Sequence, residues 1–549
     1  MKINRKATGA VLLILLMGIG VTLMSCQKKE AGVTVSVQEN DGPFVPYTEM
    51  VTILVPIIQQ NGTNAPKGET LEDNFVTRFY TEKLNIKFKS AWTVDETSAN
   101  EKLNAAVASN ELPDMFNTNV ETLGRLIKAG QVQPLDEVYE KYASPRLRDI
   151  VESQEGRGLL PGFVDNKHYA LPIVADGFPV MMFFRKDWLD KLGLKVPATI
   201  DEMLIVARAF RDNDPDGNGI NDTIAFALDR DFGQIRAGIN ALGNPLGAYT
   251  GIWIPDGSGG LVYGGIQPAI KELLTLMRQM YAEGLFDKEF AIKDVNKAAQ
   301  DIAADKVGIY SGPFWAPLFP LMMSVQNNPS ADWVVSPLMA NKDGKRIVQT
   351  SIPISGLFVV RAGYPHPDAL IKAMNLWAEM FHGEYAEDFN QLVATEKYID
   401  IMGVWQNYNL PYFFQHPDKN IYLSDNVIEA LKKNDESICF NQESRRTYEA
   451  IINGGLEGWG QNKVFGEGGT IQILKAYKDF VPDEFLGAPT TTMTLRTATL
   501  EKLENEAYFS VIMGEPVDTT FNKFVNDWKS QGGDQITKEV NDWYKSVRQ

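Results

Sequence analysis

Short β-branched runs and helical patterns alternate along the chain, and this alternation restricts the possible fold more than any other feature. Residues 51–57 (VTILVPI) have the composition of a buried parallel strand. A helical pattern follows over residues 71–84, then a strand near 86–88 and a helix over about 98–109. A strand at 356–360, a helix at 369–381 and an amphipathic segment at 271–283 continue the order. Strands that alternate with helices predict βαβ units and a doubly wound α/β fold.

The chain is long enough for several domains but contains no obvious linker. At roughly 150 residues per domain, 549 residues suggest two to four domains or lobes. Stretches rich in Gly and Pro are short and scattered, so none of them divides the chain into consecutive domains. This pattern favours lobes that share the chain through several crossings.

The composition excludes several classes of protein. The formal charge of −17 would repel phosphate backbones, so we expect no nucleic-acid partner. The hydrophobic content of 44% is that of a globular protein. Two cysteines, Cys26 and Cys439, and four scattered histidines provide neither a disulfide framework nor a Cys/His metal cluster. Any metal in this chain would therefore be bound through oxygen.

The N-terminus has the pattern of a secretory signal. Lys2, Arg5 and Lys6 precede an uncharged apolar run over residues 7–24, and an uncleaved membrane helix is the alternative. The segment 23–26 (LMSC) resembles the lipobox of bacterial lipoproteins, which implies that Cys26 is lipidated, with palmitate among the acyl groups. We predict a signal peptide over 1–25 and a flexible tether over 26–48. Removing residues 1–25 leaves 50 basic and 70 acidic residues, a net charge of −20.

Several later segments resemble the bacterial extracellular solute-binding proteins of ABC importers. The first two are 169–173 (YALPI) and 182–193 (MFFRKDWLDKLG), near which the chain of these proteins passes from the first lobe to the second. Residues 308–315 (GIYSGPFW) are similar to a segment that brings an aromatic residue to the cleft. Residues 485–490 (FLGAPT), 512–514 (IMG) and 521–544 resemble the large oligosaccharide-binding branch of the family.

The resemblance implies a two-lobe periplasmic-binding-protein fold of type II, with interleaved lobes, a hinge and a ligand cleft between the lobes. Lobe 1 would comprise residues 49–173 and about 334–382, and lobe 2 about 174–333 and 383–549. The implied partners are a carbohydrate ligand and the transmembrane subunits of an ABC permease. We expect a monomer on the extracytoplasmic face of the cell membrane, held there only by the lipid anchor.

Residues 214–223 (DPDGNGINDT) have the pattern of a calcium loop. Asp214, Asp216 and Asn218 occupy positions 1, 3 and 5, Ile220 could contribute its carbonyl at 7, and Asp222 falls at 9. Position 12 is Ala225, so the bidentate Glu of an EF-hand is missing. In solute-binding relatives a Glu often follows the position-9 Asp, where this chain has Thr223. We predict a structural Ca²⁺ site, and an Asp/Gly/Asn turn is the alternative.

Sugars present apolar C–H faces and hydroxyl edges, so a carbohydrate site needs stacking aromatics and polar groups. Gly312-Pro313 can lift the ring of Trp315 out of the core. Core or interdomain packing is the alternative for each aromatic candidate. The candidate ligand-binding residues are Asp176, Trp253, Trp315, Arg361, Trp405, Tyr408 and Trp459.

No catalytic motif is recognisable in the sequence. Residues 466–469 (GEGG) lack the Lys-Ser/Thr of a phosphate-binding loop, and no histidine pair has the HExxH spacing. We therefore predict a binding protein and not an enzyme. A surface glycoside hydrolase or polysaccharide lyase that uses two carboxylates remains an alternative, because carboxylate separation is invisible in sequence. An adhesion or scaffolding lipoprotein is a third hypothesis.

Overall fold

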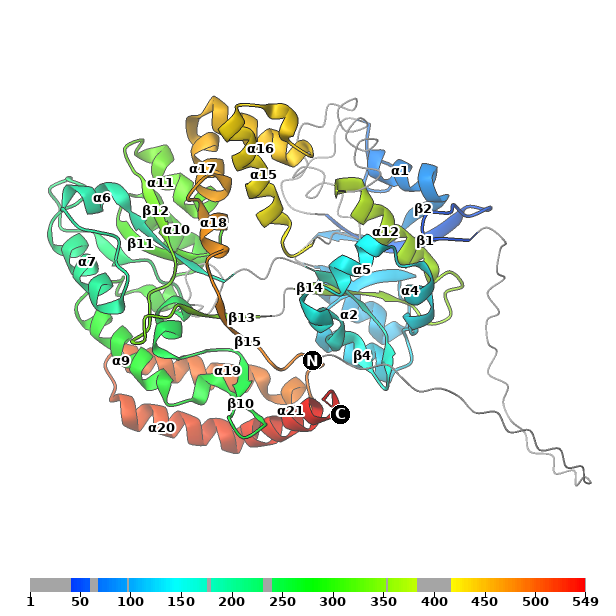
Figure 1. Cartoon of the computed structure of the whole chain (residues 1–549). Helices are drawn as coiled ribbons and strands as arrows, with labels where there is room; N and C mark the ends of the chain where they lie inside the picture. The colour runs from blue at the N-terminus through cyan, green and yellow to red at the C-terminus, as the bar shows by residue number, and fades with distance from the viewer. Residues whose placement is uncertain are drawn as a thin grey trace, which may run out of the picture. The chain divides into compact units, whose positions relative to one another are not determined.

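Two separate hydrophobic cores divide the chain into two lobes (Figure 1). The structure is a computed structural model that describes residues 41–59, 68–95, 98–174, 179–230, 239–351, 354–382 and 416–548. Lobe 1 takes its buried side chains from residues 51–174 and 357–380. Lobe 2 takes them from residues 181–348 and 423–544. The chain therefore leaves lobe 1, returns to it, and leaves it again.

Lobe 1 contains a three-stranded sheet of order β3-β14-β6, with helices on both faces, and the strand pairs β1-β2 and β4-β5. Its strands are β1 (Val51–Gln59), β2 (Ile86–Asp95), β3 (Met115–Thr118), β4 (Phe163–Val164), β5 (Lys167–His168), β6 (Leu171–Val174) and β14 (Ile354–Val360). Its helices are α1 (Phe75–Leu84), α2 (Ala99–Ser109), α3 (Val120–Lys128), α4 (Asp136–Tyr142), α5 (Pro145–Val151), the 3₁₀ helix η1 (Gln154–Gly162) and α12 (Asp368–His382).

Strand β14 is the centre of this sheet because it pairs antiparallel with both β3 and β6. Phe358 and Val360 point into the cluster formed with α1, α4, α5 and α12, whereas Leu357 and Val359 point into the cluster formed with α2 and α3. This alternation gives three layers, because successive side chains of a strand lie on opposite faces. Strand β1 joins β3 through the Asp114 N–H, which donates to the Leu54 carbonyl at 2.8 Å.

The helix and strand types predicted for lobe 1 are confirmed, with one difference in burial. Helix α1 begins after Asn74, whose side chain and that of Thr77 form a reciprocal capping box. Strand β1 pairs parallel with β2, as expected, but its side chains alternate between buried and exposed. Leu54 is 40% exposed, so only one face of this parallel pair is covered.

Lobe 2 has a second sheet and most of the helices. Its strands are β7 (Met181–Arg185), β8 (Ile224–Phe226), β9 (Trp253–Pro255), β10 (Leu261–Tyr263), β11 (Val307–Gly312), β12 (Trp333–Ser336), β13 (Ile347–Thr350) and β15 (Asp479–Pro482). Its helices are α6 (Lys186–Lys191), α7 (Ile200–Asp212), α8 (Asn240–Gly243), α9 (Ala269–Ala282), α10 (Val295–Ala303), α11 (Met322–Asn327), α15 (Lys419–Lys433), α16 (Gln442–Asn453), α17 (Gly455–Phe465), α18 (Thr470–Leu474), α19 (Thr491–Ile512), α20 (Val517–Trp528) and α21 (Asp534–Ser546).

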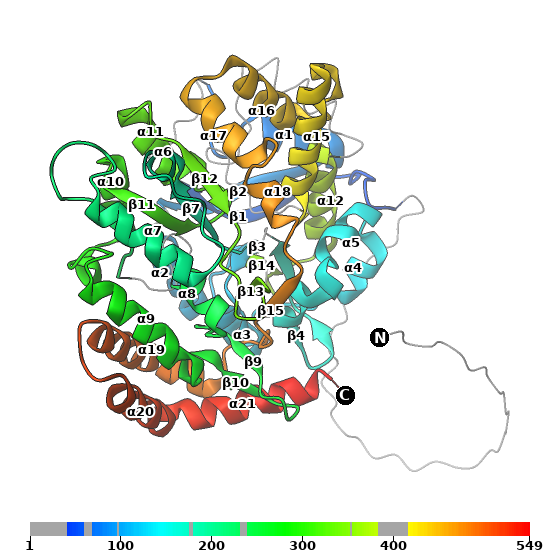
Figure 2. The ribbon, with the colours of Figure 1, turned by 60° about the vertical axis from the view of Figure 1, so that its left-hand side comes forward.

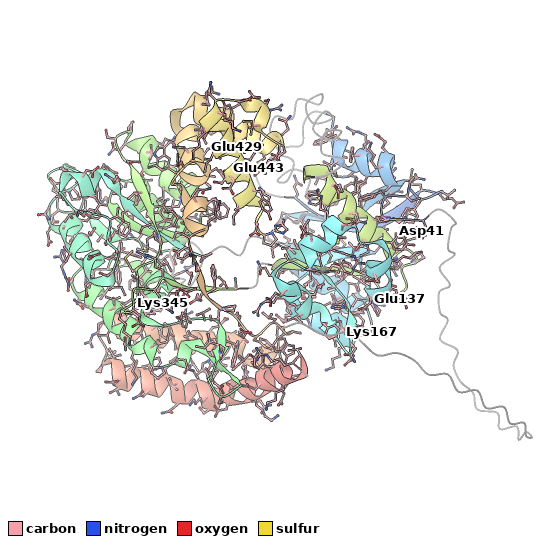
Figure 3. The ribbon with its side chains drawn as sticks, viewed as in Figure 1. Asp41, Glu137, Lys167, Lys345, Glu429 and Glu443 are labelled. Atoms are coloured by element: carbon pink, nitrogen blue, oxygen red, sulfur yellow. The ribbon has the colours of Figure 1, made fainter. Side chains whose placement is uncertain are left out.

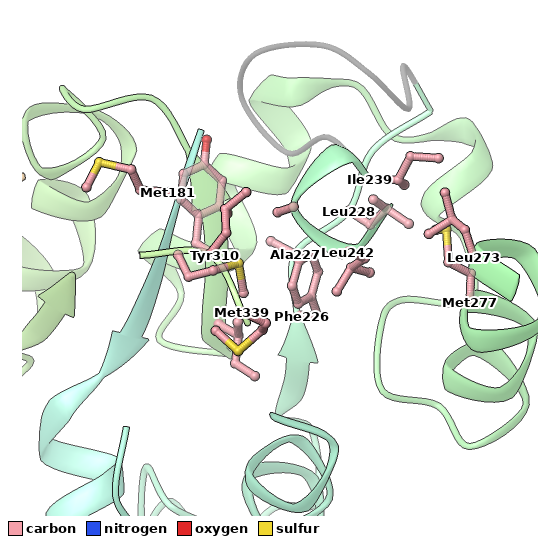
Figure 4. Close-up of a cluster of buried hydrophobic side chains, with 14 of the residues drawn as sticks. Met181, Phe226, Ala227, Leu228, Ile239, Leu242, Leu273, Met277, Tyr310 and Met339 are labelled. Atoms are coloured by element: carbon pink, nitrogen blue, oxygen red, sulfur yellow. The ribbon is translucent and has the colours of Figure 1, made fainter. Parts of the chain in front are cut away.

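The main sheet of lobe 2 has the strand order β12-β7-β11-β8. Its core combines Met181 and Tyr310 of neighbouring strands with Phe226, and Figure 4 shows these side chains together with those of α8 and α9. Gly308 permits close packing of α7 on β11, because a Cβ at this position would lie 2.2 Å from the Phe210 ring. Helices α19 and α20 lie beside α9 (Figure 2).

The return from lobe 2 to lobe 1 lies later in the chain than predicted. Residues 334–351 were expected in lobe 1, but β12 pairs antiparallel with β7, and Leu338, Met339 and Val348 are buried in the lobe 2 core. Strand β13 pairs parallel with β15 of the same lobe. The chain therefore re-enters lobe 1 between Thr350 and β14, not near residue 334.

Residues 41–48 lie against lobe 1, although the predicted tether includes them. The Asp41 carboxylate, labelled in Figure 3, accepts hydrogen bonds from Lys141 at 2.8 Å, from Lys372 at 3.3 Å and from the Tyr142 hydroxyl. Tyr47 packs on the core and donates to Asp368. Residues 41–48 are therefore part of lobe 1 and not of a flexible tether. In the described part of the chain, no helix is long and apolar enough to cross a membrane.

Candidate functional site

Two of the predicted ligand-binding residues have structural partners instead. Trp253 is 6% exposed and packs against Tyr263 and Phe485, with ring centroids 5.6 and 6.5 Å away. The Arg361 guanidinium donates to buried Asp114 at 2.7 Å and so joins β14 to β3. Trp253 is therefore a core residue, which corrects the prediction for it. Arg361 forms an ion pair within lobe 1, and its contact with a ligand stays a prediction.

Trp315 and Trp459 are half-buried residues of lobe 2. Trp315 follows β11 as predicted, and Trp459 lies on α17, where its Nε1 donates to Asp332 Oδ1 at 3.4 Å. Neither residue lines the two cavities described below. Their contact with a ligand stays a prediction. Asp176, Trp405, Tyr408 and Cys26 lie outside the described residues.

A cavity of about 460 Å³ lies where the two lobes and the crossings between them meet. Gln154 comes from lobe 1, and Pro179 and Ser351 come from the crossings. The remaining residues come from lobe 2, where they lie in β13, α15, α18 and β15 or in the segments next to these elements. The full lining is Gln154, Pro179, Thr350, Ser351, Pro417, Asp418, Ile421, Leu474, Lys475, Tyr477 and Phe480. The volume is that of a site for a small organic ligand.

Apolar and polar groups alternate around this cavity. The Phe480 ring is 48% exposed, although it belongs to strand β15. Tyr477 is fixed by its hydroxyl, which accepts a hydrogen bond from the Leu338 N–H at 2.6 Å, and burial raises its pKa to about 12. Lys475 forms an ion pair with Asp425 at 2.7 Å. Rings beside amide, hydroxyl and carboxyl groups suit a polyhydroxylated ligand with apolar faces.

A second cavity, of about 490 Å³, adjoins the first. Both cavities are lined by Gln154, Pro417 and Asp418. The additional lining residues are Pro145, Arg148, Asp149, Glu152, Ser153 and His416. Helix α5 of lobe 1 and the start of α15 of lobe 2 therefore face each other across this cavity.

The sequence analysis did not identify any of these cavity residues. Asp418 directly precedes a helix, where an aspartate ordinarily indicates an N-cap. Tyr477 and Phe480 lie in a segment without the Gly residues that flank the other aromatic candidates. The position of Thr350 and Ser351 before a lobe crossing was the one usable signal, and it was missed because the crossing was placed near residue 334.

The predicted calcium loop is a compact turn between α7 and β8. Asn218 Nδ2 donates to Asp216 at 2.7 Å and to Asp222 at 3.2 Å, and the Gly219 N–H donates to Asp214 Oδ2 at 3.1 Å. Glycine suits this turn because Gly217 and Gly219 both have φ of +77°. Thr223 was predicted to be a calcium ligand. Its buried hydroxyl instead donates to the Phe210 carbonyl at the end of α7.

The loop carboxylates interact strongly with one another. The hydrogen bond with Asp216 lowers the pKa of Asp214, whereas burial and Asp214 raise the pKa of Asp216. Lys306 lies 3.0 Å from Asp222 and lowers its pKa. Asp214 Oδ1 is shielded from solvent and accepts no hydrogen bond within the described structure. Over the same residues, no group of three or more His, Cys, Asp or Glu is arranged to hold a metal ion.

Several known proteins are similar to this chain in sequence. The family described as bacterial extracellular solute-binding protein matches residues 61–432. Lipoprotein LipO of Bacillus subtilis is 24% identical over 529 residues, which cover 91% of this chain and 93% of LipO. The polygalacturonan/rhamnogalacturonan-binding protein YtcQ of B. subtilis is 23% identical over 484 residues, 85% of this chain and 87% of YtcQ.

A solved structure supports the assignment of the fold. The ABC-transporter substrate-binding protein FusA of Streptococcus pneumoniae, an EF-hand mutant in complex with fructo-nystose, matches with a TM-score of 0.61 at 17% identity. The match covers 90% of this chain and 99% of FusA. The family match spans more than half of the chain, and the fold agrees with it. The chain therefore belongs to the bacterial extracellular solute-binding proteins.

Proposed function

We propose that this protein is the substrate-binding component of an ABC transporter, which captures an oligosaccharide or related carbohydrate and delivers it to a membrane permease. The observation that carries the proposal is the 460 Å³ cavity, to which both lobes and the crossings contribute aromatic and polar side chains. YtcQ, which binds polygalacturonan and rhamnogalacturonan, and FusA, which was solved with fructo-nystose, support the same class of substrate.

Ligand capture follows from the way in which the cavity is divided between the lobes. Gln154 belongs to lobe 1, whereas Asp418 and Tyr477 belong to lobe 2. A ligand that contacts both sets stabilises the arrangement in which the lobes are close, because it makes all its contacts only in that state. The permease would then recognise the closed form of the protein.

Purified protein mixed with a panel of oligosaccharides tests this function. We expect saturable binding of one ligand per protein by calorimetry and no new saccharide by chromatography after prolonged incubation. Turnover of any panel member would favour the glycoside hydrolase or lyase alternative. A protein that neither binds nor cleaves any carbohydrate would favour the scaffolding alternative.

We also propose that Cys26 anchors the protein in the membrane through lipid. The apolar run before Cys26 and the name of the relative LipO support this anchor. In an exporting bacterial host, we expect the full chain to incorporate labelled palmitate and to fractionate with membranes. Cys26→Ala should abolish both properties, whereas Cys439→Ala, which changes a buried thiol, should leave both intact. Equal labelling of the two variants would contradict the anchor.

Calcium binding by the 214–222 loop is a separate proposal. Asp214, Asp216, Asn218, the Ile220 carbonyl and Asp222 would hold the ion, and Thr223 is not required. The shielded, unpartnered Oδ1 of Asp214 and the crowded Asp214–Asp216 pair support it. A bound Ca²⁺ supplies the positive charge that relieves the repulsion between these carboxylates.

Thermal unfolding with and without chelator tests the calcium site. At free Ca²⁺ about 100 times the dissociation constant, the expected stabilisation is about 2.7 kcal/mol. Asp214→Asn should remove the dependence on Ca²⁺, whereas Asp212→Asn, at the end of α7 and paired with Arg211, should keep it. An unchanged midpoint of the native protein after chelation would contradict a structural calcium ion.

A further inference from the structure

We propose that the two adjoining cavities form one elongated site for an uncharged oligosaccharide, in which Gln154 and Asp418 bind the sugar unit at the junction. This inference rests on the proposed carbohydrate-binding function and specifies its substrate as neutral sugar chains, to the exclusion of uronate chains.

The elongated shape follows from the residues that the cavities share. Gln154, Pro417 and Asp418 line both, so the cavities of about 460 and 490 Å³ are contiguous at these three residues. Each volume alone lies within the range of about 300–1,000 Å³ that is typical of one small-molecule site. A ligand that fills both must therefore be longer than one or two sugar units.

Asp418 provides a hydrogen-bond acceptor at the junction that no described residue uses. It occupies the N-cap position of α15, yet its side chain caps no backbone N–H of that helix. Its half-buried carboxylate has no hydrogen-bond or ion-pair partner among the described residues. A carboxylate in such a position accepts strong, charge-assisted hydrogen bonds from sugar hydroxyls.

Gln154 faces the same junction from lobe 1. Its φ of +55° is left-handed, a conformation that is rare for a residue with a side chain and is concentrated at ligand sites. It is the first residue of η1 and lies shortly after the end of α5. The amide can both donate to and accept from sugar hydroxyls, so Gln154 and Asp418 bind the same unit from different lobes.

The cationic side chains that line the cavities are already neutralised by the protein. Arg148 lies 3.2 Å from Glu140 and 3.5 Å from Glu152, and its Nη2 donates to two backbone carbonyls. Lys475 donates to both oxygens of Asp425 at 2.7 and 2.8 Å.

The His416 ring is engaged in the same way. Its Nδ1 accepts a hydrogen bond from the Asp418 N–H at 3.1 Å, and its Nε2 lies 3.8 Å from Asp149. A uronate carboxylate would thus find no unpaired cation among the described lining residues. It would instead meet the carboxylates of Asp149 and Asp418, which makes its burial unfavourable.

Calorimetry with the purified protein and two matched ligand series tests the proposal. One series consists of neutral gluco-, manno- and fructo-oligosaccharides of about two to six units, and the other of oligogalacturonates of equal length. We expect binding of a neutral series that strengthens with length until both cavities are filled, and uronate binding weaker by at least about 100-fold. Tightest binding of the uronate series would overturn the inference while the proposed function stands. Failure of the native protein to bind any carbohydrate would overturn the proposed function itself.

Variants test the two junction residues. Asp418→Asn should weaken binding of the neutral ligand about 10-fold or more and strengthen uronate binding, because it removes both an acceptor and a repelling charge. Gln154→Ala should weaken binding of the neutral ligand about 5-fold or more.

Glu429→Gln is the control. It changes an exposed carboxylate of α15 that is paired with Lys433 and labelled in Figure 3. Unchanged affinities in a normally folded Asp418→Asn protein would overturn the role of the junction residues. The substrate class is decided without any variant, because the native protein is compared on the two ligand series.

Discussion

Glu504 is a buried carboxyl group on α19 that is surrounded by tyrosines. Its Oε2 accepts a hydrogen bond from the Tyr263 hydroxyl at 2.8 Å, and the Tyr263 ring stacks on Trp528 at 5.2 Å. Burial raises the pKa of Glu504 to about 7, although the hydrogen bonds from Tyr263 and Tyr508 lower it. The folded protein therefore keeps this group protonated at pH values at which an unfolded chain ionises it.

We expect the free energy of unfolding to fall as the pH rises. The unfolded group loses its proton near its ordinary pKa of 4.5 and the folded group near 7, so the decrease lies between these values and reaches about 3 kcal/mol. Urea unfolding at about pH 5 and pH 8 measures it. Glu504→Gln should flatten the dependence, whereas Glu501→Gln on the same helix should retain most of it. An equal slope in the native and Glu504→Gln proteins would contradict the assignment.

Trp253 shows how little the residue type reveals about burial. We expect Trp253→Phe to lower the free energy of unfolding by about 1–3 kcal/mol, because it leaves a gap beside Tyr263 and Phe485. The affinity of the folded variant for carbohydrate should equal that of the native protein. Calorimetric titration beside chemical unfolding separates the two properties. A large loss of affinity without loss of stability would restore Trp253 to the ligand site.

At the level of elements, the segment 41–48 acts as an ordered strap on lobe 1. Lys372 on α12 is 3% exposed and has Asp41 as a carboxylate partner. Removing one member of a buried ion pair leaves an uncompensated charge, which is strongly destabilising. We expect Asp41→Asn to lower the free energy of unfolding by about 2–3 kcal/mol.

The control for the strap is Asp73→Asn, which changes an exposed carboxylate paired with Arg78. Because exposed ion pairs contribute about 0–1 kcal/mol, this change should be nearly neutral. Chemical unfolding of the three proteins under one set of conditions gives the comparison. Equal stability of the two variants would show that Asp41 does not hold residues 41–48 on lobe 1.

The elements that were predictable from sequence are those whose signals are local. The predicted end of α1 at residue 84 is confirmed, and Asn85 with φ of +57° is its left-handed C-cap. The predicted start at residue 71 is wrong by four residues, because the helix begins at Phe75 after the Asn74 capping box. The exposed face of β1 could not be predicted, because exposure depends on how distant segments pack, and no described helix covers this face. An apolar run gives no information about its distant neighbours.

For the molecule as a whole, the sequence predicted interleaved lobes but not the positions of the crossings. Strand β12 has only four residues, and its place beside β7 is fixed by pairing over about 150 positions of the chain. Dependence on distant segments also explains why the residues of the two cavities were not predicted. Asp418 and Gln154 meet only when two distant segments fold together, and each residue taken alone has an ordinary local interpretation as a helix cap or a polar loop residue.

Arg157 of lobe 1 connects the two lobes away from the sheets. It donates to the Asp483 carbonyl at 2.8 Å and lies 3.5 Å from the Glu484 carboxylate, just after β15. We expect Arg157→Ala to increase hydrogen exchange in β13 and β15 and to destabilise the protein by about 1 kcal/mol. A double-mutant cycle with Glu484→Gln isolates the carboxylate contribution. Unchanged exchange in both strands would show that the contact does not restrain the crossings.

The central position of β14 determines the order in which this protein can fold. Strands β3 and β6 have no partner between them until residues 354–360 have been synthesised, after nearly all of the first lobe 2 segment. A nascent chain that ends before Ile354 therefore cannot complete lobe 1, and lobe 2 in turn awaits the helices after residue 416. Long-range pairing of this kind folds slowly. Such a delay would favour the proposed export of this protein, because a chain has to be unfolded to pass through a translocation channel.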